Sequence, residues 1–388
     1  MKKTVLALAA TSLFSGLAHA QSSVTLYGII DEGFDYTSNS AGHASYQLVN
    51  GMAQGSRWGL RGAEDLGGGL KAVFWLENGF NVNTGTLGQG GLGFGRQASV
   101  GLSSNRYGTF TVGRQYDSLF STYLGPTTAN GNWGGLLLAH PYDNDNTDGT
   151  FRNNNSVKYD SPNIGGFQIG GTYGFSNGTD FADNNSYSIG AKYTNGGLLV
   201  AAAYLRAESP GENSTGAIPP SGSADFVSKG LQIFGGGVNY TFGKATLGFV
   251  YTNSLINQPA ATATSVYIGT IAGPGGGIIN SLRFQNFEVN FRYLVTPSFF
   301  IGGQYVYTTE KMSATNLVAS PKINLLGLMV DYSLSKRTDV YLQSAYERVS
   351  GDKTGTVLDH AYITTTAGGG LSSSANQLAV RIAVRHRF

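Results

Sequence analysis

The sequence predicts an all-β fold and, within that class, a transmembrane antiparallel β-barrel of 16 strands. Three observations support this. Apolar and polar residues alternate along many short segments. After residue 20, no apolar run approaches the ~18 to 20 residues that a membrane helix requires. The connections between the alternating segments are short and long in turn, as at the two rims of a membrane barrel.

The composition agrees with a fold made of strands. The chain has 388 residues, no cysteine and 12% charged residues, about half the usual share. Glycine is abundant, with 57 residues, and the 22 tyrosines and 21 phenylalanines far outnumber the 3 tryptophans. The lack of cysteine excludes disulfide scaffolds and zinc ribbons. The glycine- and aromatic-rich composition is unlike that of an ordinary cytoplasmic enzyme.

The first twenty residues have the parts of a secretory signal peptide. Lys2 and Lys3 are basic, residues 4–18 are apolar or small, and Ala18-His19-Ala20 fits the cleavage pattern. We expect a signal peptide over 1–20 and one outer-membrane β-barrel domain over 21–388. Removing the two lysines leaves 23 basic and 23 acidic residues, so global charge gives a nucleic-acid partner no support.

The expected strands follow a period of two. Residues 378–385 show it most clearly, with apolar side chains at even positions and Ala379 and Arg381 among the odd ones. The expected strands begin near Val24, Ser56, Leu70, Gly95, Thr109, Asn155, Gly166, Tyr187, Leu198, Leu231, Lys244, Leu282, Ser298, Lys322, Thr338 and Asn376.

Loop lengths orient this barrel. Short connections are expected at 65–69, 105–108, 162–165, 194–197, 243, 296–297 and 335–337. Long ones are expected at 37–55, 81–94, 117–154, 176–186, 207–230, 254–281, 309–321 and 349–375. Both termini then lie at the short-turn, periplasmic rim. A barrel of ~16 strands encloses an aqueous channel, whereas one of ~8 fills with side chains.

The alternative fold is a secreted all-β solenoid or sandwich. Such a fold buries one face of each strand in a dry core and exposes the other to water. Here the second face is rich in Gly, Thr, Gln, Asn and isolated charges, and aromatic residues lie near many strand ends. This favours a lipid-facing band with aromatic girdles around a wet interior.

Seven segments carry a family resemblance: SSVTLYGIIDEGF (22–34), SRWGLRGAEDLGGGLKAVFWLE (56–77), GRQASVGL (95–102), YGTFTVGRQYD (107–117), NWGG (132–135), FRNNNSVKYDSP (151–162) and VRHRF (384–388). In these, the chain resembles the trimeric general porins of Gram-negative outer membranes, most closely the beta-proteobacterial branch. The resemblance implies a 16-stranded barrel, a homotrimer and a third long loop folded into the pore. It implies lipopolysaccharide and the outer-membrane assembly machinery as partners, with Phe388 as the assembly signal. Alternation also places Phe388 on the lipid face, where it serves equally as a girdle residue.

Six basic residues are candidates for the wall of a pore constriction: Arg57, Arg61, Arg96, Lys71, Arg381 and Arg385. Alternation turns Arg57, Arg61 and Lys71 into the lumen. Arg96 matches the family position that contributes to the basic cluster. Arg381 and Arg385 come from the closing strand, which neighbours the first. The alternative is that each is a solvated lumen residue away from the constriction.

The opposing charge is expected from the long connection 117–154, whose acidic cluster is Asp143, Asp145 and Asp148. Loops beyond ~15 residues are usually functional or disordered. Folded inward, these acids would face the arginines and set a transverse field. The acidic loop motif of the enteric porins is missing, and NWGG stands near its place, so a surface-loop cluster is the alternative. A calcium site of EF-hand type is disfavoured, because Asp148 stands where the template requires glycine.

The sequence therefore predicts a passive diffusion channel for ions and small hydrophilic solutes, sieving by pore size and by charge at the constriction. The basic cluster favours anions. A substrate-specific porin with a saturable site is the alternative, and flux saturation distinguishes it. No cofactor or metal is expected. Catalytic motifs such as H-E-x-x-H and G-x-S-x-G are missing, which disfavours an enzyme. Arg114 is interpreted as structural or interfacial.

Overall fold

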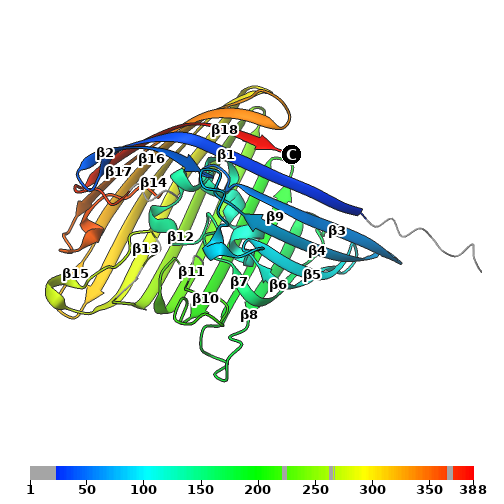
Figure 1. The fold of residues 1–388 in the computed structure, drawn as a ribbon, viewed down its shortest axis with the longest axis horizontal. Coiled ribbons are helices and arrows are strands. Elements are labelled where there is room, and N and C mark those ends of the chain that lie inside the picture. The colour runs from blue at the N-terminus through cyan, green and yellow to red at the C-terminus, as the bar shows by residue number, and fades with distance from the viewer. Residues whose placement is uncertain (1–22, 221–224, 262–264, 266, 365–369) are drawn as a thin grey trace, which may run out of the picture.

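The computed structural model describes residues 23–220, 225–261, 265, 267–364 and 370–388. The expected signal peptide, residues 1–20, lies outside the described residues. The described strands form one antiparallel sheet that closes on itself through β1 and β18 (Figure 1). The strands are β1 (Ser23–Ser40), β2 (His43–Asn50), β3 (Arg57–Gly67), β4 (Leu70–Gly79), β5 (Gln97–Ser104), β6 (Gly108–Gln115), β7 (Asn153–Asp160), β8 (Phe167–Gly174), β9 (Ser186–Asn195), β10 (Leu198–Glu208), β11 (Ser228–Phe242), β12 (Ala245–Pro259), β13 (Ile279–Thr296), β14 (Phe299–Ala314), β15 (Val318–Ala319), β16 (Pro321–Ser333), β17 (Thr338–Gly351) and β18 (Asn376–Arg387).

The described chain has eighteen strands, but two pairs of strands each occupy a single strand position, so the barrel wall has sixteen positions. β2 and β3 both pair with β1 and lie one above the other along it. β15 and β16 share the place beside β14 in the same way. The prediction of a closed 16-stranded antiparallel barrel is therefore confirmed. The split between β2 and β3 was not predicted, because residues 51–56 leave the wall and carry no alternating pattern.

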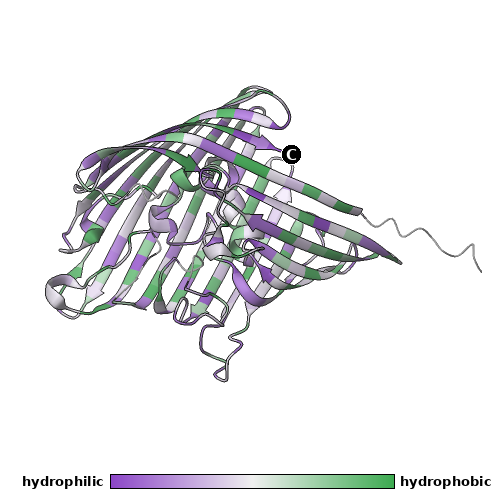
Figure 2. Cartoon of the chain, viewed as in Figure 1, coloured by the Kyte–Doolittle hydropathy of each residue, from purple (hydrophilic) through white to green (hydrophobic). Residues whose placement is uncertain are grey.

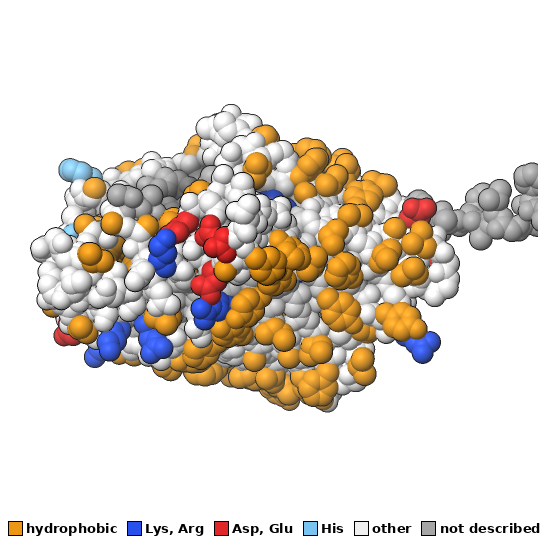
Figure 3. Space-filling view, turned by 90° about the horizontal axis from the view of Figure 1, so that it is seen from below, with side chains coloured by type: hydrophobic (Ala, Val, Ile, Leu, Met, Phe, Trp, Pro, Cys, Tyr) orange, Lys and Arg blue, Asp and Glu red, His pale blue; other side chains and the backbone are white. Residues whose placement is uncertain are grey.

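The two faces of the wall differ as the alternation predicts. Hydrophobic and hydrophilic residues succeed one another along each strand (Figure 2). In β18, Ile382 and Val384 point outward and are exposed, whereas Arg381 and Arg385 point inward and are buried. Hydrophobic side chains cover much of the face seen in Figure 3, whereas charged ones gather mostly in its left half, with a few at the right end. This is the surface that a hydrocarbon environment requires. Among the described residues, no helix is both long and apolar enough to cross a membrane.

Aromatic residues mark both edges of the apolar band. Near the short turns the exposed ones include Tyr107, Phe110, Tyr240, Phe242, Tyr293 and Tyr332. Toward the long loops they include Tyr46, Tyr187, Phe234, Tyr305 and Tyr346. Such rings lie at the boundary between lipid and water. The chain ends at the short-turn rim, where Phe388 and Gly28 exchange two backbone hydrogen bonds of 3.0 Å.

Residues 117–152, between β6 and β7, lie inside the barrel and are here named the inner segment. They form short helical turns and are mostly buried. Inward side chains of the opposite wall hold this segment: Gln304 Nε2 donates to Leu138 O at 2.7 Å, and Gln343 Nε2 donates to Gly134 O at 2.6 Å. The inner segment thus crosses the lumen to β14 and β17.

Candidate functional site

Three arginines converge on the lumen wall opposite the held part of the inner segment. They are Arg57 of β3, Arg96, which directly precedes β5, and Arg152, the last residue of the inner segment. Arg96 Nη2 and Arg152 Nη2 each donate to the hydroxyl oxygen of Tyr116, both at 2.6 Å. The Arg152 guanidinium also lies 4.6 Å from the centre of the Tyr116 ring. We name Arg57, Arg96 and Arg152 the arginine cluster.

One carboxylate balances the three positive charges at close range. Glu77, an inward residue of β4, accepts from Arg96 Nε at 2.8 Å, and its Oε1 lies 4.0 Å from Arg57 Nη1. Tyr27 also donates to Glu77 Oε2 at 2.7 Å. Because the wall offers one acid to three guanidinium groups, the arginine cluster keeps a positive field toward the lumen.

The predicted basic residues do not all lie in this cluster. Arg57 and Arg96 belong to it. Arg61 lies further toward the short turns on β3, is exposed, and stacks 4.8 Å from the Tyr27 ring centre. Lys71 lies at the short-turn rim, opposite Asp65. The structure thus separates Arg61 and Lys71 from the arginine cluster along the barrel axis.

Arg381 and Arg385 are engaged by carboxylates elsewhere in the wall. Fully buried Arg381 donates to Asp35 at 2.7 Å and to Asp31 at 3.1 Å, across the seam between β18 and β1. Arg385 Nη2 lies 3.1 Å from an oxygen of Asp331 and 3.0 Å from one of Asp339. Their charges are balanced locally, so both arginines join strands instead of facing the arginine cluster.

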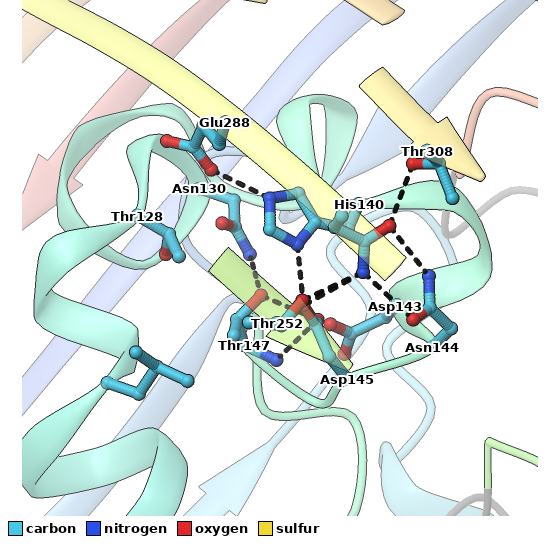
Figure 4. Close-up of polar contacts among 12 residues, drawn as sticks. Thr128, Asn130, His140, Asp143, Asn144, Asp145, Thr147, Thr252, Glu288 and Thr308 are labelled. Carbon is cyan, nitrogen blue, oxygen red and sulfur yellow. Dashed lines mark hydrogen bonds and ion pairs between the residues drawn. The ribbon is translucent and has the colours of Figure 1, made fainter. Parts of the chain in front are cut away.

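The three acids predicted to face the arginines, Asp143, Asp145 and Asp148, have different partners, and Figure 4 shows those of Asp145. Asp145 is turned to the wall: its Oδ2 lies 2.6 Å from His140 Nδ1 and accepts from Thr252 Oγ1 at 2.5 Å. Asp143 accepts from the backbone of Asp148 at 3.0 Å. Asp148 is the acid of this trio on which Arg57, Arg96 and Arg152 together act electrostatically.

Burial changes the protonation of these loop groups. It raises the pKa of Asp143 to about 7, with the Asp145 carboxylate adding to the effect. Burial and the Asp143 carboxylate raise the pKa of Asp148 well above its usual range, although the three arginines oppose this. Burial lowers the pKa of His140, but Asp145 and Glu288 outweigh it and raise that pKa to about 10. Below neutral pH, Asp143 and Asp148 therefore carry little charge.

A buried polar network ties the inner segment to β13. His140 Nε2 lies 2.8 Å from Glu288 Oε2, and Glu288 Oε1 accepts from the backbone N–H of Ala129 at 2.7 Å. Asn286 Nδ2 donates to Asn144 Oδ1 at 3.0 Å and to Asp145 Oδ2 at 3.2 Å. These side chains come from segments about 140 residues apart, so sequence reasoning missed the network.

The inner segment also rests on residues 51–56, here named the bend. The backbone N–H of Leu136 donates to Met52 O at 2.8 Å. Gly135 adopts a φ of +64° and lies so close to the bend that a Cβ atom would come within 2.2 Å of Met52 O. Only glycine fits this contact. The excursion that splits β2 from β3 therefore supports the middle of the inner segment.

Other functional residues were missed although the sequence held a signal for some of them. Arg152 stands in the quoted segment FRNNNS, and Glu77 falls on the inward face by alternation. Arg114 donates to Gly95 O at 2.8 Å and to Asn154, at the base of the inner segment. In the part of the chain that the structure describes, no group of three His, Asp or Glu residues is arranged to hold a metal ion.

Known proteins resemble the whole chain. A family model described as Gram-negative porin matches residues 5–352. An outer membrane porin protein of Bordetella pertussis is 32% identical over 418 aligned positions, and outer membrane porin protein 32 of Delftia acidovorans is 30% identical over 411; each match covers 100% of both chains. Among solved structures, an anion-selective porin from Comamonas acidovorans has a TM-score of 0.69 at 24% identity, covering 95% of this chain and 100% of that one. A trimer form of OmpT from Vibrio cholerae has a TM-score of 0.62 at 18% identity, covering 95% and 99%.

Proposed function

This chain belongs to the Gram-negative porin family, and on that premise we propose that it is a general porin whose constriction favours anions. It is a passive diffusion channel of the Gram-negative outer membrane. The proposal concerns how the channel selects: the inner segment narrows the lumen, and the arginine cluster sets the charge at that level.

The observation that carries the proposal is the imbalance of charge around Tyr116. Three guanidinium groups have one ionised carboxylate, Glu77, at close range. Of the facing acids, Asp145 is paired with His140, and burial favours the neutral form of Asp148. A permeating anion therefore meets a positive wall in a narrow space, where field lines are focused and screening is reduced. Cations meet the same field as a barrier.

The remaining parts of the assignment follow from the family. A homotrimer is proposed, supported by the trimer form of the Vibrio structure. Lipopolysaccharide and the assembly machinery are proposed partners of the outer face and of Phe388. Cleavage after Ala20 is proposed for export. The proposed activity is passive and needs no catalysis, energy coupling or cofactor.

The test is single-channel recording of the detergent-purified protein in a planar bilayer under a potassium chloride gradient. We expect large steps that close in three equal levels and a reversal potential that favours chloride. A reversal potential favouring potassium would overturn the anion preference. Silence from a barrel shown to be folded by its heat-modifiable electrophoretic mobility would overturn the channel assignment.

A further inference from the structure

A second arginine site lies between the inner segment and the short turns. Arg292 points inward from β13, two residues after Asn290, whose Nδ2 donates to Thr127 O of the inner segment at 3.2 Å. Its guanidinium carbon lies 5.2 Å from the centre of the Phe300 ring. Within the described part of the chain, no Asp or Glu forms an ion pair with Arg292. Its positive charge is therefore available to a ligand.

Two aromatic rings stand beside this charge. Trp133, from the inner segment, meets Phe300 edge to face with ring centres 6.3 Å apart. Gly302 of β14 makes room for the indole, since a Cβ atom there would lie 2.9 Å from it. Trp133 and Arg292 thus both contact the Phe300 ring and help to fix its position.

Arg292 lies where two hollows meet. One, of about 280 Å³, is lined by Arg292, Trp133, Phe300 and Gln54 and reaches the turn between β13 and β14. The other, of about 290 Å³, shares Arg292, Asn132 and Leu294 with the first. These volumes lie at the small end of ligand pockets, a size that suits a single ring with one substituent.

The acids of the first hollow are already occupied. Asp339 accepts from Arg385 Nε at 3.0 Å and from Arg387 Nη1 at 2.7 Å, and Asp331 accepts from Arg385 Nη2 at 3.1 Å. With three arginines to two carboxylates, the hollow has an excess of positive charge. An anionic ligand is therefore preferred over a cationic one.

We propose that this hollow is a binding subsite for small aromatic carboxylates, with Arg292 holding the carboxylate and the rings of Phe300 and Trp133 contacting the ligand ring. A planar guanidinium matches a carboxylate with two parallel hydrogen bonds. Aromatic rings favour edge-to-face or offset contacts with another ring. The inference rests on the proposed channel function. It names a class of solutes that bind to the channel during passage, in addition to being selected by size and charge.

The test is block of chloride current by benzoate, with acetate as the carboxylate that lacks a ring. In the parent protein, benzoate added on the short-turn side is expected to reduce the current in a saturable manner, at about fivefold lower concentration than acetate. Arg292→Gln is expected to raise the half-blocking concentration of benzoate at least about fivefold. Phe300→Leu should remove the preference for benzoate over acetate while keeping weak block by both.

The matched control is Arg283→Gln, because Arg283 lies on the same strand but points outward. It is expected to leave benzoate block unchanged. Equal block by benzoate and acetate in the parent, or unaltered block in Arg292→Gln, overturns the subsite. Equal sensitivity to benzoate and sulfate means a general anion site and overturns the aromatic class. The same recordings give the conductance without benzoate. If the parent protein forms no channels, the channel function is overturned. If channels are open but benzoate does not block them, the subsite is overturned.

Discussion

His140 Nε2 lies 2.8 Å from Glu288 Oε2, although the two residues are 148 positions apart in the chain. The other ring nitrogen of His140 lies 2.6 Å from Asp145. All three side chains are fully buried. One imidazolium between two carboxylates therefore joins the inner segment to the barrel wall at β13.

Replacing His140 by Ala is expected to release this tie. Asp145 and Glu288 would be left buried without their cation, which costs about 3–5 kcal/mol when a buried pair is broken. The released segment should produce frequent brief closures in single-channel records and a lower melting temperature. His43→Ala, at an exposed position of β2, is the matched control. Quiet open channels in His140→Ala would contradict the tie.

The same tie should weaken at alkaline pH. The pKa of His140 is raised to about 10, above its ordinary value of ~6.5, by Asp145 and Glu288 against the effect of burial. Its contribution to stability is therefore full below ~6.5, declines as the pH rises, and is lost above about 10. Closures should become more frequent between pH 7 and 11 in the parent. In His140→Ala the frequency of closures should not follow pH in this range.

Anion preference should fall as the pH rises through neutrality. Burial raises the pKa of Asp143 to about 7, and burial with the Asp143 charge raises that of Asp148 further above its usual range. These acids are neutral below their raised pKa values and ionise above them, so added negative charge then opposes the arginine cluster. Reversal potentials at pH 5.5 and 8.5 measure this. A preference that stays constant in the parent, or rises, would show that the acids do not act on the pore.

Removing one member of the arginine cluster should reduce chloride preference. Arg152→Ala deletes a charge next to Tyr116, and we expect the chloride-to-potassium permeability ratio to fall about two- to fivefold, the effect of roughly 0.5–1 kcal/mol of Coulomb energy in a water-filled lumen. Arg61→Ala is the control, since Arg61 is inward but lies nearer the short turns. An equal fall in both variants would mean that the selective level is not at the cluster.

Phe388 should matter more to assembly in cells than to folding in vitro. Its ring covers Gly28, where a Cβ atom would lie 2.2 Å from the ring. Phe388→Ala keeps the backbone hydrogen bonds to Gly28 but removes the aromatic group. We expect a several-fold lower amount in the outer membrane and near-normal refolding in detergent micelles. Phe242→Ala, a girdle residue at the same rim, should affect neither strongly. Equal losses in cells and micelles would assign Phe388 to stability alone.

The wall of the barrel could be predicted from sequence because alternation is a local property. A period of two in residues 378–385 is enough to place Arg381 inward. The partners of Arg381 could not be found in this way. They depend on the register across the closing seam, where Asp35 lies opposite Arg381, 346 residues away in sequence. Pairing across the seam, not alternation, separates this arginine from the arginine cluster.

The interior was harder to predict for the same reason. The length of the connection 117–154 suggested an inward loop, but its contacts follow no period. The side chain of Asp145 is oriented by its contacts with His140 and Thr252. From residue type alone, Asp145 and Asp148 could not be distinguished. The bend could not be predicted from the sequence because its residues show no periodicity. Its structural role depends on the hydrogen bond from Leu136 to Met52, which only the folded chain shows.

The bend has a mechanical consequence. The inner segment connects β6 to β7 and is bound at the far wall by Gln304 and Gln343. In its middle, Leu136 is hydrogen-bonded to Met52 of the bend. The inner segment is therefore held at both ends and also along its length, unlike a loop that is attached by a single hinge. While all of these supports are in place, the inner segment keeps the aperture at one width, and solutes are selected by their size and charge.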